Sequence, residues 1–381
     1  MQKEALCDEK DCTGCGACFA ACPVQCIRMT PDDYGFYRPK INHDMCIHCN
    51  KCASVCPHNH ILQEQSVQSV WAAWNKNQEE HAICASGGIA SALYTCALNN
   101  DFVVSGAEFT QKLQLKHTLK SGTESTEKYK SSKYVQSLCF DVFQDIKHHL
   151  TNGRKVLFVG TPCQVAGLKS FIGNNDRLFT VDLICHGVPS PKFLSEHVEG
   201  LAHSKDSDIL VSFRDRDGWQ FKVFENGTAV YSQTAKRDLY YLAFLNALCY
   251  RPCCYACQYA NLSRVGDLTL GDFWGLGKKE PFSNPVEKVS LVLINNSRGE
   301  QLWENISGLV CREKRQLEEA VIDNAQLLHP SVPHANRNKF LEEYEKFGFE
   351  EASRRSLKSD LRMNTIAELK QKIAYKARHW F

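Results

Sequence analysis

The chain has 381 residues, with 45 Lys and Arg against 43 Asp and Glu, so its net charge of +2 excludes a strongly basic nucleic-acid-binding protein. An apolar content of 43% excludes a disordered or fibrous chain, and the length suggests two or three domains. Cysteine is the unusual residue: ten of the 20 lie between Cys7 and Cys56. Neither a signal peptide nor a run of apolar residues long enough to span a membrane is evident. We therefore expect a cytoplasmic protein without a transmembrane segment, whose reduced thiols bind metal rather than form disulfides.

A cysteine pattern occurs twice near the N-terminus. It reads Cys-x2-Cys-x2-Cys-x3-Cys-Pro, and it starts at Cys12 and again 34 positions later at Cys46. In such duplicates, three close cysteines of one copy and the fourth of the other hold one 4Fe-4S cube. Zinc sites are the alternative, but they leave the third cysteine and the trailing Cys-Pro of each copy unexplained. We predict a bacterial-type ferredoxin module over residues 1–62, with clusters held by Cys12, Cys15, Cys18 and Cys56 and by Cys46, Cys49, Cys52 and Cys22.

Two further cysteines of this region, Cys7 and Cys26, fall outside the pattern. We expect Cys26 to be a small buried residue beside a cluster rather than a ligand.

Beyond Leu62 the apolar pattern alternates between helices and strands. This alternation indicates a layered α/β body, so the fold class is α+β: a ferredoxin module, an α/β body over residues 63–150 and 151–330, and a helical tail over 331–381. In chain order we predict a helix over 66–77, a helix over 89–98, a strand over 102–104, exposed strands within 112–130, a helix over 140–150, a strand over 156–160, a helix over 164–171 and a strand over 178–184.

Three loops of the body carry residues capable of chemistry. The segments 160–164 and 184–187 each follow a predicted strand, and ligands of α/β sheets tend to lie at the carboxyl ends of strands. The third loop, 251–257, contains Cys253, Cys254 and Cys257. Neither a P-loop nor a G-x-G-x-x-G fingerprint is present, so a standard nucleotide-binding fold is not indicated.

Five short motifs stand in an order that resembles one family. They are Ala-Ser-Gly-Gly at 85–88, Ser-Lys-Tyr-Val-Gln-Ser at 132–137, Gly-Thr-Pro-Cys-Gln at 160–164, Asp-Leu-Ile-Cys-His-Gly at 182–187 and Leu-Thr-Leu-Gly-Asp-Phe-Trp-Gly at 268–275. Together they are similar to the family of coenzyme F(420) hydrogenase/dehydrogenase beta subunits, in the form with a fused N-terminal ferredoxin. The resemblance implies a flavin-binding body and an iron–sulfur flavoprotein oxidoreductase. Electrons would pass between the clusters, FAD and a small-molecule substrate, either the deazaflavin F(420) or another reducible metabolite. The residues do not distinguish FAD from FMN.

The resemblance also implies a third cluster near the flavin. Cys254 and Cys257 form the one C-x2-C pair of the body, while Cys163 and Cys185 lie on the two strand-end loops. We take these four as the ligands, although Cys253 could replace Cys254. The remaining isolated cysteines are expected to be buried apolar thiols: Cys84, Cys96, Cys139, Cys249 and Cys311.

The same resemblance suggests the residues that contact the flavin and the substrate. The simpler interpretations are a turn and helix cap for the Ser-Gly-Gly triplet and for Thr161, a solvated side chain for the lysine, and a Gly-flanked turn for the last two residues. His186 is the candidate proton donor, because the unperturbed pKa of histidine lies near working pH, with a strand-end cap as the alternative. The flavin-side candidates are Ser86, Gly87, Gly88, Lys133, Thr161, Asp272 and Trp274.

Two functions remain open at this point. The first is a FAD-dependent iron–sulfur reductase, and the alternative is an electron-transfer subunit without its own substrate site, feeding a partner enzyme. Either would need ferredoxin or another electron-donor or acceptor protein, and a homo-oligomer is possible. The tail over 365–381 predicts a basic amphipathic helix that docks on the body or a twin subunit, or contacts a membrane surface. Its apolar face contains Ile366, Leu369, Ile373, Ala377 and Trp380.

Overall fold

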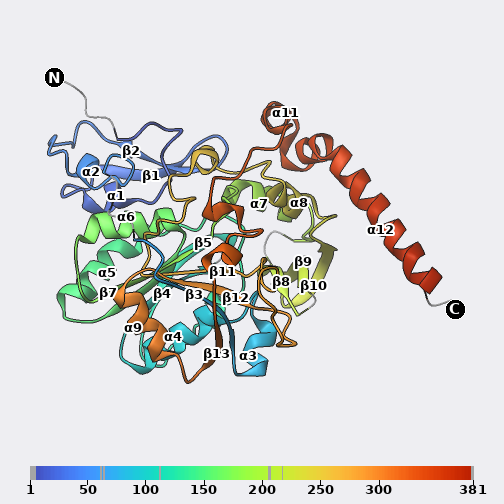
Figure 1. Cartoon of the computed structure of the whole chain (residues 1–381). Coiled ribbons are helices and arrows are strands. Elements are labelled where there is room, and N and C mark those ends of the chain that lie inside the picture. The colour runs from blue at the N-terminus through green and yellow to red at the C-terminus, as the bar shows by residue number, and fades with distance from the viewer. Residues whose placement is uncertain are drawn as a thin grey trace.

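The computed structural model describes residues 6–60, 62, 65–110, 113–204, 207–216 and 218–378, with side chains to residue 370. Figure 1 shows a small N-terminal module lying over one side of a central sheet, and two C-terminal helices on another side. The last helix leads away from the rest of the chain. The mixed organisation and the helical tail predicted from the sequence are confirmed. The domain boundaries stay predictions.

The N-terminal module consists of short elements joined by cysteine-rich loops. Its two strands pair antiparallel, with Ile27 opposite Ile41. Helix α1 begins after Gly16, whose positive φ of 78° favours glycine, and it ends at Cys22, just before Pro23. The elements are α1 (Ala17–Ala21), β1 (Ile27–Pro31), β2 (Tyr37–Ile41) and α2 (Lys51–Ser54).

An eight-stranded sheet forms the centre of the body, in the order β13-β3-β12-β11-β7-β6-β4-β5. The neighbours β11, β7, β6 and β4 run parallel, so their carboxyl ends meet at one edge. Every residue of β6 and of β12 is buried, as expected for strands covered on both faces. The strands are β3 (Ser69–Asn75), β4 (Val103–Phe109), β5 (Leu115–Lys120), β6 (Val156–Gly160), β7 (Leu178–Leu183), β11 (Leu268–Asp272), β12 (Ser290–Ile294) and β13 (Val310–Arg315).

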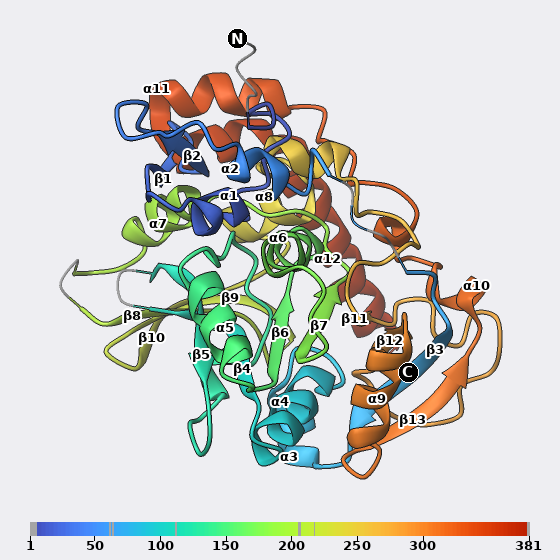
Figure 2. The same cartoon turned by 90° about the vertical axis from the view of Figure 1, so that its left-hand side faces the viewer.

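Helices cover both faces of this sheet (Figures 1 and 2). On one face α4 and α9 share a core with the strands, including the fully buried Trp303. On the other face α5 and α6 pack against the strands, and α1 of the N-terminal module joins the same core through Ala17 and Ala20. The elements are α3 (Gln78–Ile83), α4 (Ile89–Asn99), α5 (Val142–Thr151), α6 (Pro162–Ile172), α9 (Ser297–Asn305) and α10 (Leu317–Ala320), with short 3-10 turns at Glu127–Tyr129, Pro252–Ala256 and Ala325–Leu327.

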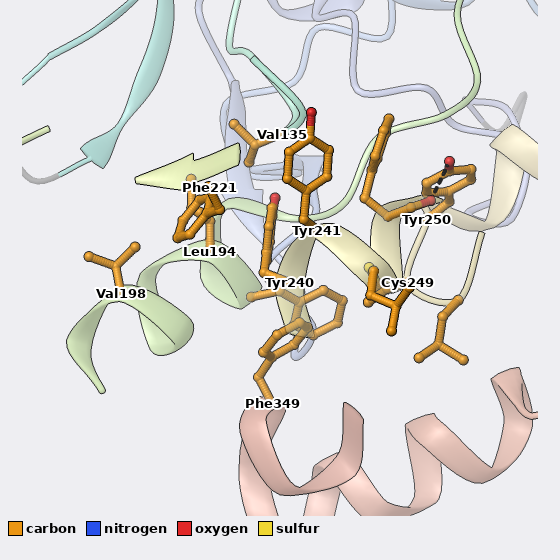
Figure 3. Packing of buried hydrophobic residues seen from close by; sticks show 14 of the residues in the cluster. Val135, Leu194, Val198, Phe221, Tyr240, Tyr241, Cys249, Tyr250 and Phe349 are labelled. Carbon is orange, nitrogen blue, oxygen red and sulfur yellow. Dashed lines mark hydrogen bonds between the residues drawn. The ribbon is translucent and has the colours of Figure 1, made fainter. Parts of the chain in front are cut away.

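A second core, rich in aromatic rings, joins a three-stranded sheet to the C-terminal helices. Tyr240 and Tyr241 of α8 are fully buried, and the ring of Tyr240 lies 5.7 Å from that of Phe349 on α11 (Figure 3). The core therefore fixes α11 to the body. The elements are α7 (Pro191–Glu199), β8 (Ile209–Asp215), β9 (Gly218–Glu225), β10 (Thr228–Thr234), α8 (Leu239–Leu245) and α11 (Arg337–Ser356), the last interrupted at Gly348.

The tail is one helix, α12 (Lys358–Arg378). Asn364 donates to the carbonyl of Lys236 and Arg237 pairs with Glu368, whereas Ile366 and Leu369 are about half exposed. These two residues of the predicted apolar face are thus not docked on the body. The side chains of Ile373 and Ala377, and residue Trp380, lie outside the described residues. No helix of the described chain is long and apolar enough to cross a membrane.

Most predicted elements of the body are confirmed, and two are wrong. The segment 66–77, predicted as a helix, forms strand β3 between β12 and β13. The segment 112–130, predicted as exposed strands, contains the single strand β5 and a 3-10 turn in its described residues.

Candidate functional site

Cysteines from both parts of the chain line one cavity of about 110 Å³. Five come from the N-terminal module and five from loops of the body, although these loops lie more than a hundred residues further along the sequence. The cavity thus brings one predicted ligand set of the module next to the predicted set of the body. The thiols are those of Cys7, Cys12, Cys15, Cys18 and Cys56, and of Cys163, Cys185, Cys253, Cys254 and Cys257.

The first ligand set, Cys12, Cys15, Cys18 and Cys56, lies at the inner side of the module. Cys12, Cys15 and Cys56 each keep only 8% of their surface exposed. Gly167 of α6 allows this close approach, because a Cβ there would lie 2.8 Å from the sulfur of Cys15. Cys7, which the pattern left out, lines the same cavity as Cys12 and Cys56.

The second ligand set, Cys46, Cys49, Cys52 and Cys22, does not line this cavity. Cys49 is exposed, and the other three are partly exposed. As expected, Cys26 is buried beside this set, with its sulfur 3.4 Å from that of Cys22. Within the described residues no three His, Cys, Asp or Glu side chains are grouped tightly enough for a single metal ion. A cube instead takes its four thiolates at separate corners around a space.

The body thiols come from three loops that the fold brings together. Cys163 lies on the first turn of α6 and Cys185 follows β7, while the other candidates lie on the loop before β11. Burial raises the pKa of Cys163 to about 12, and the charges of Cys257 and Cys253 act in the same direction. Burial also raises the pKa of Cys185 and of Cys257. Thiols in such surroundings become thiolates only when a cation such as iron binds them.

The electrostatic contacts among these thiols bear on the choice between Cys253 and Cys254. Cys253 acts on Cys163 and on Cys257. Its hydrogen bond with Cys254 is the largest cause that raises its own pKa. Both thiols line the cavity. Cys253 and Cys254 both stay candidates for the fourth ligand.

A second cavity, of about 460 Å³, lies at the carboxyl ends of β6, β7 and β11. It shares a wall with the first cavity, made of Thr161 and residues 185–188. Seven of the eight predicted flavin-side and catalytic residues line it: Ser86, Gly88, Lys133, Thr161, His186, Asp272 and Trp274.

Gly87 is the predicted residue that does not line this cavity. Its backbone N–H donates to the hydroxyl of Ser290, which in turn donates to Ser86. A Cβ at this position would lie 2.2 Å from the carbonyl of Ala73. Gly87 therefore anchors the Ser-Gly-Gly turn to the sheet.

Lys133 is half-buried, and its side chain turns back onto its own loop. Its ammonium donates to the backbone carbonyls of Tyr129, Lys130 and Ser131 at 3.2, 2.8 and 3.2 Å. Burial lowers the pKa of Lys133 to about 7. The three carbonyls hold the ammonium at the cavity wall, where it can add positive charge to the site.

His186 stands between the two cavities and lines both. The residue is exposed, and desolvation by the surrounding protein lowers the pKa of its imidazole. Its backbone carbonyl accepts a 2.6 Å hydrogen bond from Ser331. The two predicted roles, proton donor and strand-end residue, are both compatible with this placement.

The remaining candidates, Asp272 and Trp274, are connected through Arg214 and Trp219, two residues that the sequence analysis did not predict. Arg214 of β8 donates to Asp272 at 2.7 Å, and its guanidinium lies 4.2 Å above the ring of Trp219. The ring of Trp219 lies 5.8 Å from that of Trp274. No motif in the sequence marks Arg214, because it belongs to the small sheet and reaches the site only through the tertiary fold.

Comparison with known proteins identifies both parts of the chain. Residues 153–320 match the model for the C terminus of the coenzyme F(420) hydrogenase/dehydrogenase beta subunit, and residues 11–60 match the 4Fe-4S dicluster domain. The F subunit of the F(420)H(2) dehydrogenase of Methanosarcina mazei is 22% identical over 279 residues, which cover 69% of this chain and 77% of that protein.

Two further matches extend over the ferredoxin module and over most of the chain. Ferredoxin 7Fe of Hydrogenibacillus schlegelii is 36% identical over 64 residues, covering 16% of this chain and 76% of that protein. A chain of the F(420)-reducing NiFe hydrogenase complex from Methanosarcina barkeri is 19% identical with a TM-score of 0.46, covering 75% of this chain and 95% of that chain.

These findings correct one expectation and confirm another. The expectation that the chain is by itself a FAD-dependent oxidoreductase is wrong, because the matching model describes a beta subunit and the Methanosarcina mazei relative is one subunit of a dehydrogenase. That expectation rested on the resemblance alone, because the sequence contains no nucleotide-binding fingerprint. The 4Fe-4S clusters of the N-terminal module are supported. The chain thus combines an N-terminal 4Fe-4S dicluster domain, at residues 11–60, with a domain at residues 153–320 that is similar to the C terminus of coenzyme F(420) hydrogenase/dehydrogenase beta subunits.

Proposed function

We propose that this chain is an iron–sulfur electron-transfer subunit that carries electrons between two partner proteins. The observation that carries the proposal is the cavity lined by thiols from both the ferredoxin module and the body. Two cysteine sets around one cavity would place two clusters next to each other. Electrons could then leave the module for the body without crossing solvent.

The exposure of the cysteines supports an order for this transfer. The cluster of Cys46, Cys49, Cys52 and Cys22 would exchange electrons with a redox partner such as a ferredoxin, since its ligands lie at the surface. The cluster of Cys12, Cys15, Cys18 and Cys56 would pass them inward. A third cluster, on Cys163, Cys185 and Cys257 with Cys253 or Cys254, would carry them to the second cavity.

We further propose that the second cavity holds a flavin, either FAD or FMN. Its volume of about 460 Å³ falls within the range of about 300–1,000 Å³ typical of cofactor sites. The ammonium of Lys133 and the guanidinium of Arg214 suit an anionic cofactor, and the rings of Trp219 and Trp274 suit a flat one. A bound flavin would supply the step between one-electron and two-electron chemistry.

The test begins with the metal content of the full chain purified without oxygen. We expect about twelve irons per chain, in three cubes of four, and release of noncovalent flavin on denaturation. Cys257→Ala should leave about eight irons, and Cys249→Ala, at a buried thiol of the aromatic core, should leave all twelve. Stoichiometric zinc in place of iron would contradict the proposal.

The second part of the test concerns the partners. Chain reduced by dithionite or by a ferredoxin should discharge into an acceptor protein, and Cys257→Ala should block that discharge. Rapid reoxidation by F(420) or another small metabolite with no second protein present would contradict the role of a subunit.

A further inference from the structure

Arg251 is a buried cation at the junction of the ferredoxin module and the body. Its side chain is among the largest that are fully buried, with 1% exposed. Nε donates to the carbonyl of Cys12 at 2.7 Å, and Nη2 donates to the carbonyl of Tyr37 at 2.9 Å. Nη1 donates to the amide oxygen of Gln136 at 3.2 Å. All three acceptors are neutral, so the guanidinium is hydrogen-bonded but its charge is not cancelled.

No carboxylate lies within ion-pair distance of Arg251 among the residues that the structure describes. The two other strongly buried arginines are paired: Arg264 with Asp182 at 3.0 Å and Arg315 with Glu319 at 2.7 Å. Buried charges in proteins are normally paired or bind a charged group, because an unpaired one loses its hydration without compensation. Arg251 therefore calls for a negative charge that the protein alone does not supply.

The predicted clusters supply such a charge on both sides of Arg251. The residue contacts the backbone of Cys12, and Cys253 follows two positions later on the loop that enters the first cavity. Hydrogen bonds with neighbouring cysteines and desolvation by burial have the largest effects on the pKa of Cys12 and of Cys253, and the charge of Arg251 lowers both. A cube held by four thiolates is negatively charged and gains one further negative charge on reduction, so a fixed cation beside it favours the reduced form.

We propose that Arg251 raises the reduction potential of the buried cluster above that of the exposed cluster and so draws electrons inward. The inference rests on the proposed ligands and direction of transfer. One electron from a reduced ferredoxin would enter the exposed cube and pass to the buried cube, with no bond broken. The exposed cluster lies at the surface, where water screens charges, and has no comparable buried cation among its described neighbours.

The sharpest test leaves Arg251 in place and cancels its charge. Gln136→Glu is isosteric and puts a carboxylate where Nη1 now meets an amide oxygen. We expect the reduction potential of the buried cluster to fall by at least about 59 mV. For a one-electron couple, this shift is a tenfold change in the ratio of oxidised to reduced cluster. Arg251→Gln should shift it in the same direction, whereas Arg251→Lys, which keeps the charge, should shift it much less.

The potentials are read by redox titration of the electron paramagnetic resonance signals of the full chain, with iron counted in every sample. The matched control is Arg38→Gln with Asp32→Asn, which removes a paired charge near the same cluster and should change the potential little. An iron-complete Gln136→Glu protein with an unchanged potential would overturn the inference and leave the proposed function intact. Loss of iron from Gln136→Glu would also overturn it, since Arg251 would then serve assembly. Wild-type protein without iron would instead remove the proposed function.

Discussion

The two copies of the cysteine pattern have the same spacing but different surroundings. Cys12 and Cys15 of the first copy are buried against the body, whereas Cys49 of the second copy is exposed. Met45 and Ile47, which flank Cys46 of the second copy, are 52% and 60% exposed. The repeat therefore predicts the ligands of two clusters but not their roles. The roles follow from what packs against each copy, which is a property of the tertiary fold.

The thiols of the body offer the strongest test of this difference between the two copies, because they share a cavity with ligands of the first, buried copy. Cys253 and Cys254 both line the cavity, and if Cys253 is the fourth ligand, Cys253→Ala should lower the iron content from about twelve to about eight. Cys254→Ala should keep all twelve. Iron analysis of the two variants decides between them, and the opposite result would restore Cys254 as the ligand.

The packing of the buried copy can be broken at Gly16. Its φ is +78°, and a Cβ would lie 2.1 Å from the Cβ of Phe140, so Gly16→Val needs a shift of the backbone. We expect a loss of about 4 kcal/mol or more, measured by urea unfolding, together with loss of iron from the buried cluster. Gly122→Val is the control: its φ is also positive, but nothing lies within 4 Å, so only a strain of about 1–2 kcal/mol is expected. Equal losses of unfolding free energy in the two variants would show that the close approach to Phe140 adds no cost beyond the backbone strain.

The sequence predicts the parts of the site whose signal is local. The cysteine spacing and the two strand-end loops are such signals, and the loops do follow two neighbouring parallel strands, β6 and β7. The segment 66–77 was predicted as a helix because Val67, Val70, Trp71 and Trp74 have helical spacing. In the structure β3 lies between two strands, and both its faces contact other elements. Such strands lose the alternation by which they are recognised. Arg214 and Arg251 could not be predicted, because each acts through partners far away in sequence.

The ferredoxin module also contacts α11, and the stability that α11 contributes should depend on pH. Tyr34 of the module donates to Glu345 of α11 at 2.7 Å, and α11 is fixed in turn by His197, which lies between Asp238 and Glu350 at 2.9 and 3.0 Å. Burial alone would lower the pKa of His197, but the hydrogen bonds with Asp238 and Glu350 raise it to about 9.

A raised histidine pKa stabilises the folded chain at low pH and not at high pH. The contribution is complete below the unfolded pKa of 6.5 and is lost as pH rises through about 9. The two values correspond to about 3 kcal/mol at most. We expect the difference in unfolding free energy between wild type and His197→Gln to shrink by this order between pH 6.5 and about 9.5. A difference that stays constant over this range would mean that the imidazole is neutral in the folded chain.

The smallest expected effect concerns the exposed copy, where Met45 and Ile47 form an apolar rim beside the ligands Cys46 and Cys49. Exposed apolar side chains around a redox centre are typical of a surface that contacts a partner only briefly. Replacing both with Glu should slow reduction by a partner ferredoxin about tenfold, which corresponds to about 1.4 kcal/mol in the transition state. Reduction by dithionite, a small molecule that needs no such surface, should keep its rate. The control is Leu328→Glu, at a residue that is 55% exposed outside the module and should change neither rate. If partner and dithionite reduction slow equally in the double variant, the substitutions act on the cluster itself and the exposed copy is not the place where the partner docks.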